Sequence, residues 1–256
     1  MTKSNGERVP PRFIELGVPP AVLASMLPVF VTLSRRIGKR PAWYAGLAIY
    51  WGIWCGVVPL ALVGRGGLKE MFRPARFDLL AAVLASVPPL VSLFGGSAVG
   101  GAGPRRESLA LALTAFGNGL GEEVLWRGMY ATGRRSDLWT SVVWPSLWFG
   151  AWHIAPGSAA AYASRVPKLV AGAFVLGLAY ATVASRTGSI RWTVASHVLT
   201  GLGLVASTLL RRARETTARS ARGPTASSDL AAVGRSGPAG SRGRRNLESK
   251  SQQRLD

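Results

Sequence analysis

Cysteine, histidine and acidic residues are all scarce in this sequence. The single cysteine, Cys55, excludes an intrachain disulfide and a metal cluster built on cysteines. Only 12 acidic residues stand against 31 lysines and arginines, which leaves a net charge of +19. The N-terminal segment MTKSNGERVPPRF lacks the basic-then-apolar order and the small-residue cleavage site of a secretory signal. These absences leave apolar and basic residues to define the class of protein.

Long apolar runs are what the sequence has in quantity. Hydrophobic residues make up 48% of the chain, and its longest runs can each cross a bilayer as a helix. Such runs occupy residues 43–63, 79–99, 109–130, 138–154, 169–185 and 192–210. A further run at residues 18–33 is shorter and contains Pro19, Pro20 and Pro28, which indicates a re-entrant or interfacial segment. The sequence therefore predicts an all-α polytopic transmembrane helical bundle of six to eight spans.

The positive charges lie between these runs and in the C-terminal tail. The densest basic loop, SRRIGKR at residues 34–40, is a candidate cytoplasmic loop. This distribution fits membrane topology and attraction to anionic lipids, and it does not fit a nucleic-acid partner. From residue 211 the chain is rich in Arg, Ser, Gly and Ala and cannot bury a core, so we expect a disordered, cytoplasmic tail. The predicted organisation is a polar lead at residues 1–17, a transmembrane domain at residues 18–210 and a basic tail at residues 211–256.

The segment GNGLGEEVLWRGMY, residues 117–130, places charges inside an apolar run. Glu122 and Glu123 are adjacent, and Arg127 lies one helical turn after Glu123, so those two side chains can pair. Glu122 lies about 100° further round the helix and is not consumed by the same arginine. A charge at mid-bilayer costs roughly 2.5–3.5 kcal/mol, which makes intramembrane carboxylates candidates for function. The alternative is a structural ion pair between Glu123 and Arg127, which leaves Glu122 unexplained.

Both histidines of the chain fall in other apolar runs. His153 lies in the run at residues 138–154 and His197 in the run at residues 192–210. A lone histidine on an apolar face is usually a packing residue, whereas titratable groups that cluster lower one another's cost of burial. We therefore expect the two glutamates and the two histidines to converge on one cavity. There they would deprotonate a water, or hold a divalent metal such as zinc through Glu122, His153 and His197.

These motifs resemble those of the CAAX prenyl protease type 2 and bacteriocin-processing (CPBP, or Abi) intramembrane endopeptidases. The segment GEEVLWR at residues 121–127 matches the EExxxR motif of that family, and FGAWH at residues 149–153 matches its FxxxH motif. His197 stands where the family places its last catalytic histidine. The resemblance covers about residues 109–210, which form the motif-bearing core of the transmembrane domain.

The resemblance implies a multi-pass protease of a bacterial cell membrane that cleaves membrane-associated peptides or proteins. By motif position, Glu122 is the general base that activates water and is held with His153. Glu123 and Arg127 then orient the site, and His197 stabilises the oxyanion or binds a metal ion. The family has been described both as metalloproteases and as glutamate-dependent proteases, and the sequence leaves both open.

One position departs from the family pattern. Many relatives carry an asparagine one turn after the last histidine, where this chain has Gly201. Losing one oxyanion donor lowers the rate about 10²–10³-fold. The neighbouring Thr200 points about 100° away from the direction of residue 201 around the helix. Two other functions therefore stay open. One is a catalytically inactive membrane scaffold or immunity factor. The other is a proton- or cation-coupled transporter, which is disfavoured because we find no internal repeat.

Overall fold

The computed structural model describes residues 12–94, 105–132, 137–159 and 166–221. Every regular element in these ranges is a helix, which confirms the predicted all-α class. The α-helices are α1 (Arg12–Ile37), α2 (Lys39–Tyr50), α3 (Val58–Met71), α4 (Leu79–Phe94), α5 (Arg105–Glu123), α6 (Trp144–Trp152), α7 (Ile154–Ala159), α8 (Val166–Thr187) and α9 (Arg191–Ala221). The described π-helices are η1 (Trp51–Val57), η2 (Val124–Gly128) and η3 (Trp139–Val143).

Several of these helices are suited to a membrane. Within the described ranges, four stretches are long and apolar enough to cross one: Leu16–Ile37, Lys39–Met71, Val166–Thr187 and Arg191–Ala218. α4 is a shorter apolar helix. The remaining predicted runs are also helical, as α5 continued by η2 and as η3 continued by α6. The chain is an all-α, polytopic integral membrane protein, and the predicted total of six to eight spans stays a prediction.

The N-terminal apolar run differs from its prediction. α1 is one continuous helix of 26 residues that runs through Pro19, Pro20 and Pro28. Membrane helices tolerate proline where neighbouring helices support the freed backbone groups, and α1 contacts α2, α6 and α7. The expectation of a re-entrant or interfacial segment was wrong, because this run lies in one of the four candidate spans.

The C-terminal helix also extends beyond its expected end. α9 continues to Ala221, whereas the sequence placed a disordered tail from residue 211. The added segment RRARETTARSA is rich in Arg and Ala, which have high helix propensity. Contacts divide the chain into two compact units, Met1–Arg212 and Ala213–Asp256. The rest of the predicted tail, residues 222–256, lies outside the described residues.

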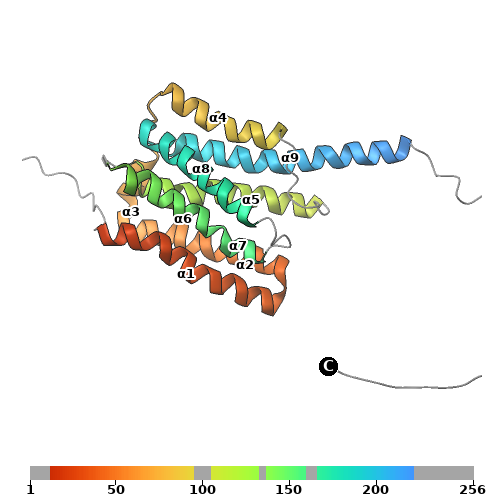
Figure 1. The fold of residues 1–256 in the computed structure, drawn as a ribbon, viewed down its shortest axis with the longest axis horizontal. Helices are drawn as coiled ribbons and strands as arrows, with labels where there is room; N and C mark the ends of the chain where they lie inside the picture. The colour runs from red at the N-terminus through yellow and green to blue at the C-terminus, as the bar shows by residue number, and fades with distance from the viewer. Residues whose placement is uncertain (1–11, 95–104, 133–136, 160–165, 222–256) are drawn as a thin grey trace, which may run out of the picture. The chain divides into compact units, whose positions relative to one another are not determined.

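An aromatic core fixes the end of α6. Trp152 stacks on Tyr50 of α2 with ring centroids 3.9 Å apart, and Phe30 of α1 meets its edge at 6.0 Å. The Nε1 atom of Trp126 donates a hydrogen bond of 2.8 Å to the Tyr50 hydroxyl. α6 also contacts α8, which in turn contacts α4 (Figure 1). The residues at the end of α6, including His153, are therefore anchored from several helices.

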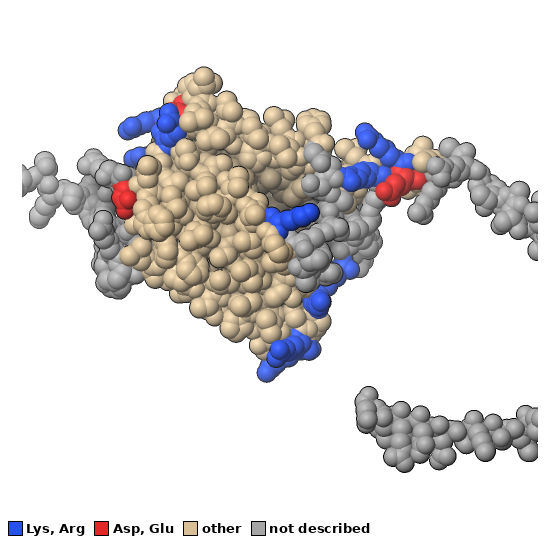
Figure 2. Space-filling view, viewed as in Figure 1, with Lys and Arg blue, Asp and Glu red and all other residues tan. Residues whose placement is uncertain are grey.

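The surface over the helices is largely apolar. Figure 2 shows a face with few charges over the helices, with lysines and arginines gathered toward its margins. α4 exposes large apolar side chains at Leu80, Val83, Val87, Leu90 and Val91. An uncharged band with basic margins is the pattern expected of a surface in contact with lipid.

Candidate active site

The glycines of α5 let neighbouring elements approach the same stretch of helix. A Cβ at Gly117 would lie 2.7 Å from Cζ2 of Trp51, and one at Gly121 would lie 3.0 Å from another side chain of η1. A Cβ at Gly119 would collide with Val198 of α9, whose backbone nitrogen would be only 2.8 Å away. Small residues allow membrane helices to pack this closely. The two glutamates that follow on α5 are therefore close to both η1 and α9.

The helix adopts π geometry directly after these glutamates. η2 spans Val124–Gly128, and all of its residues are buried. Single-turn π segments within α-helices are frequent at functional sites. Arg127 lies in η2 and reaches back to Glu123, with Nη1 3.1 Å from Oε1. The pair expected from helical spacing is therefore present, although the backbone here is not α-helical.

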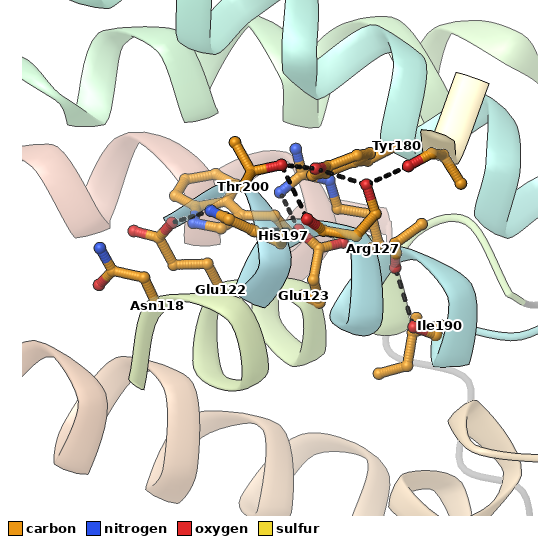
Figure 3. Close-up of polar contacts among 12 residues, drawn as sticks. Asn118, Glu122, Glu123, Arg127, Tyr180, Ile190, His197 and Thr200 are labelled. Carbon is orange, nitrogen blue, oxygen red and sulfur yellow. Dashed lines mark hydrogen bonds and ion pairs between the residues drawn. The ribbon is translucent and has the colours of Figure 1, made fainter. Parts of the chain in front are cut away.

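Glu123 is the centre of a buried charge network (Figure 3). Its Oε1 atom lies 2.8 Å from Nδ1 of His197, in addition to its contact with Arg127. The side chains of Glu123 and Arg127 are 0% and 1% exposed, whereas that of His197 is 12% exposed. An ionised carboxylate only accepts hydrogen bonds, so Nδ1 of His197 carries the proton of this contact. The other ring nitrogen, Nε2, is the one that faces Glu122.

One carboxylate oxygen of Glu122 accepts a hydrogen bond, and the other has no hydrogen-bond partner among the described residues. Trp152 donates a hydrogen bond of 3.0 Å from Nε1 to Oε1 of Glu122. The Oε2 atom is buried and accepts no hydrogen bond from the described residues. It lies 3.7 Å from Nε2 of His197. This separation is too long for a direct hydrogen bond, so Oε2 keeps an unused acceptor position beside His197.

Two aromatic rings enclose the guanidinium of Arg127. Its Cζ atom lies 4.0 Å from the centroid of the Phe149 ring and 5.5 Å from that of Tyr180. A cation over an aromatic face gains about 2 kcal/mol when both groups are desolvated. The Tyr180 hydroxyl is in turn hydrogen-bonded to Ser196 at 2.9 Å and to Thr200 at 3.2 Å. Arg127 is thus a buried charge held by its ion pair and by rings from α6 and α8.

His153 lies beside this network and makes a different contact. Its Nδ1 atom donates to the carbonyl oxygen of Phe149 at 2.7 Å, which leaves Nε2 as an acceptor. The Phe149 ring contacts both histidine rings, with centroid distances of 4.9 Å to His153 and 6.3 Å to His197. No direct contact between His153 and either glutamate is among the interactions of the described residues. The other four predicted site residues are linked by direct contacts, whereas the ring that His153 contacts is that of Phe149.

Sequence reasoning missed two side chains that organise the site. His153 was expected to hold Glu122, whereas the hydrogen bond to Glu122 comes from the adjacent Trp152. The signal was available, because Trp152 stands within the FGAWH motif beside the histidine. Tyr180 belongs to no motif and is identified only by its contacts with Arg127 and α9.

Gly201, where many relatives carry asparagine, has a packing role. A Cβ at Gly201 would lie 2.6 Å from Cβ of Ala115 and 3.2 Å from its Cα. α5 and α9 are so close here that an asparagine would have to push them apart. Thr200 does not replace the missing donor, because its hydroxyl donates to the carbonyl of Ser196 at 2.7 Å. The departure from the family pattern is therefore accompanied by closer helix packing.

The described side chains do not form a complete metal site. Among these residues, no group of three or more His, Cys, Asp or Glu side chains is close enough to hold a metal ion. Catalytic zinc sites use three protein ligands and a water. Glu122 and His197 offer two ligand atoms, and the third predicted ligand, His153, is not in contact with them. The described geometry does not fit a three-ligand site, and the divalent metal stays a prediction.

Fold and site together define a helical membrane protein with a buried carboxylate–imidazole centre. Residues 104–203 match the family model described as type II CAAX prenyl endopeptidase, Rce1-like. This part of the chain matches the family that the motifs resemble, and it contains all the predicted site residues. The match supports a CAAX-type intramembrane protease whose substrate is a peptide in the membrane. No curated protein and no solved structure matches the chain.

Proposed function

We propose that this protein hydrolyses peptide bonds of membrane-associated substrates with a water that Glu122 activates. The observation that carries the proposal is the open Oε2 atom of Glu122, buried and 3.7 Å from Nε2 of His197. A water in contact with both atoms donates a proton to the carboxylate. Trp152 holds the same carboxylate at Oε1, so Oε2 stays directed at that water.

The proposed reaction begins when the water oxygen attacks the scissile carbonyl carbon. As the new C–O bond forms, a water proton passes to Oε2 of Glu122, and the carbonyl π electrons move onto oxygen to give an oxyanion. The tetrahedral intermediate then collapses, the C–N bond breaks, and the proton on Glu122 passes to the leaving amine. One water is consumed, and the products are a carboxylic acid and an amine.

Glu123 and Arg127 act on this reaction through His197. The 2.8 Å hydrogen bond from Nδ1 to Glu123 fixes the ring so that Nε2 faces Glu122. When Nε2 carries a proton it donates to the oxyanion, and the ionised Glu123 stabilises the resulting imidazolium. The charge of Arg127 offsets that of Glu123, and both side chains are shielded from bulk solvent. Glu123 and Arg127 are therefore positioning residues.

The proposed substrate is a peptide held at the membrane by an apolar anchor. The prenylated CAAX proteins of the family description are the first candidates. Bacteriocin leader peptides and membrane-bound regulators are the other classes to compare. In each of them, anchoring confines the scissile bond to the layer in which the helices lie, and this raises its local concentration.

Cleavage by purified protein in liposomes tests this function. The substrates are a farnesylated CAAX peptide, the same peptide without the prenyl group, and a transmembrane peptide, each with a fluorophore and a quencher. We expect cleavage of an anchored peptide and a loss of about 10²–10⁴ in rate for Glu122→Gln, the range of general-base catalysis. Glu70→Gln is the matched control, because Glu70 is exposed and pairs only with Arg73 among the described contacts.

The possible outcomes separate the alternatives. If the wild-type protein cleaves none of these peptides, the proposal of a catalytically inactive scaffold is favoured over that of a protease. If Glu122→Gln cleaves at the wild-type rate, the assignment of the base is wrong. A chelator should leave the rate unchanged, and a loss of rate that zinc restores would support the metal-dependent mechanism instead.

A further inference from the structure

The proposed reaction creates an oxyanion, and most donors of α9 near His197 are already engaged. The Ser196 hydroxyl donates to the carbonyl of Ala85, and the Thr200 hydroxyl donates to the carbonyl of Ser196. Gly201 has no side chain and lies against α5. Of the side chains on this part of α9, His197 therefore offers the open ring nitrogen, Nε2, which donates when the ring is an imidazolium.

On η2, α6 and α8, the donors in contact with the charge network are engaged or enclosed. The Nε1 atom of Trp152 donates to Glu122. The Tyr180 hydroxyl is shared with two hydroxyls of α9. The Nη1 and Nη2 atoms of Arg127 have no hydrogen-bond partner among the described residues. The group is, however, paired with a carboxylate of α5, enclosed by the rings of Phe149 and Tyr180, and only 1% exposed. Arg127 is therefore held away from an incoming carbonyl, and a second oxyanion donor is better sought on α5.

Asn118 is placed to supply it. It lies one turn before Glu122 on α5, and residues four apart share a face of a helix. Figure 3 shows the two side chains beside each other at one end of the site. Trp51 donates a hydrogen bond of 2.9 Å from Nε1 to Oδ1 of Asn118. An indole nitrogen only donates, so the amide oxygen faces Trp51, and the amide nitrogen Nδ2 is left to donate elsewhere.

The sequence around Asn118 keeps this amide in position. Trp51 lies directly against Gly117, where a Cβ would come within 2.7 Å of its ring. The residue after Asn118, Gly119, lets α9 pack against the same helix. Trp51 therefore sits close enough to α5 to fix the amide plane before substrate binds. A donor oriented in advance needs no reorganisation when charge develops.

We propose that Nδ2 of Asn118 donates a hydrogen bond to the oxyanion formed when the water on Glu122 attacks the scissile carbonyl. The carbonyl oxygen receives the π electron pair, and hydrogen bonds from Asn118 and His197 stabilise its charge from two helices. The amide keeps its protons throughout. This assignment rests on the proposed protease function and gives Asn118 the task of a donor that Gly201 cannot supply.

Steady-state kinetics of variants at this position test the assignment. Asn118→Ala should lower kcat by about 10²–10³, as removal of one oxyanion donor does, and leave KM within about twofold. Asn118→Asp retains an oxygen for Trp51 but loses both donors and adds a negative charge, so its loss should be at least as large. Thr114→Val is the control, because Thr114 lies one turn earlier on α5 and its hydroxyl donates to its own helix at Ala110.

Binding of a tetrahedral analogue gives a second readout that a purely structural role would not produce. The probe is the substrate peptide with a phosphonate in place of the scissile amide. Asn118→Ala should bind this probe about 10²-fold more weakly, and bind an uncleavable N-methyl amide peptide as the wild type does. Trp51→Phe keeps a ring on Gly117 but loses the N–H, so it should show a smaller loss of the same kind. If Asn118→Ala does not fold, the same measurements of kcat and of probe binding are made on Asn118→Asp and Trp51→Phe.

Failure of this inference is distinct from failure of the proposed function. If Glu122→Gln is inactive while Asn118→Ala and Asn118→Asp keep kcat within about twofold of wild type, Asn118 is not an oxyanion donor and the protease proposal stands. If the wild-type protein cleaves nothing, both proposals fall. A shifted pH profile of kcat/KM in Asn118→Ala would also contradict the assignment, because an amide does not titrate.

Discussion

Replacing Glu123 by glutamine should damage the fold, whereas the same change at Glu122 should damage only the reaction. Glu123→Gln removes the charge that faces Arg127 and keeps an amide oxygen that can still accept from His197. Glu122→Gln keeps an oxygen for the hydrogen bond from Trp152 and removes only the open carboxylate oxygen. The two substitutions are chemically identical and lie on adjacent residues, so each is the control for the other.

The expected cost of Glu123→Gln follows from burial. Glu123 and Arg127 are 0% and 1% exposed, and their ion pair is 3.1 Å long. Removing one partner of such a pair leaves an uncompensated buried charge and costs about 3–5 kcal/mol. The rings around Arg127 are present in both proteins, so they do not offset this loss. A loss of several kcal/mol is a large fraction of the stability of a typical domain.

The assay measures folded yield and activity separately. Size-exclusion chromatography in detergent gives the fraction folded, thermal unfolding gives the stability, and the cleavage rate is expressed per folded molecule. Glu123→Gln combined with Arg127→Met should recover part of the lost stability, because it removes both charges together. Its cleavage rate should stay low, since His197 has lost its charged partner.

Two results would refute this reasoning. If Glu123→Gln folds as well as the wild type, the ion pair does not support the fold. If Glu123→Gln is folded but inactive while Glu122→Gln cleaves normally, the roles of the two glutamates are reversed.

Two further predictions concern packing and charge away from the reaction. Gly201→Asn should lower the melting temperature by the equivalent of about 1–3 kcal/mol of overpacking, and adding Ala115→Gly should recover part of it, since a Cβ at residue 201 would lie 2.6 Å from that of Ala115. No recovery would show that the close approach of α5 and α9 is not the cause. A hydrogen bond from Arg186 lowers the pKa of Asp78, which lies just before α4. Because the folded pKa lies below the unfolded value of about 3.9, this pair stabilises the protein above that pH and is lost as the pH falls through the folded pKa. Asp78→Asn should therefore lower the melting temperature near neutral pH and have no effect in strong acid, and an equal effect at every pH would contradict the assignment.

The fold class could be predicted from the sequence because a long apolar segment can cross a membrane in few structures other than a helix. Each predicted run proved largely helical over its described residues, since a membrane requires that backbone groups pair within the segment. The error at residues 18–33 has a specific cause. Proline predicts a break in an isolated helix, but α1 packs against three neighbouring helices that the sequence does not show.

The sequence indicated which charged residues to consider for the candidate site, and it indicated less well which of their side chains contact one another. Helical spacing identified the pair of Glu123 and Arg127, and the motifs located both histidines. Spacing along one helix does not say which residue of another helix arrives opposite, so the contact between Glu123 and His197 was not foreseen. The role of Trp152 was missed for a similar reason, because a one-residue difference turns a side chain by about 100°.

A single-turnover cleavage in water enriched in heavy oxygen tests the central claim, activation of water by Glu122, most directly. Reconstituted protein in excess over an anchored peptide substrate is analysed by mass spectrometry, both in the product and in the protein segment that contains Glu122. Direct attack by water predicts the label in the new carboxyl group of the product and none in the protein. Label in the carboxylate of Glu122, with unlabelled product, would show that Glu122 attacks the substrate itself and would contradict the account.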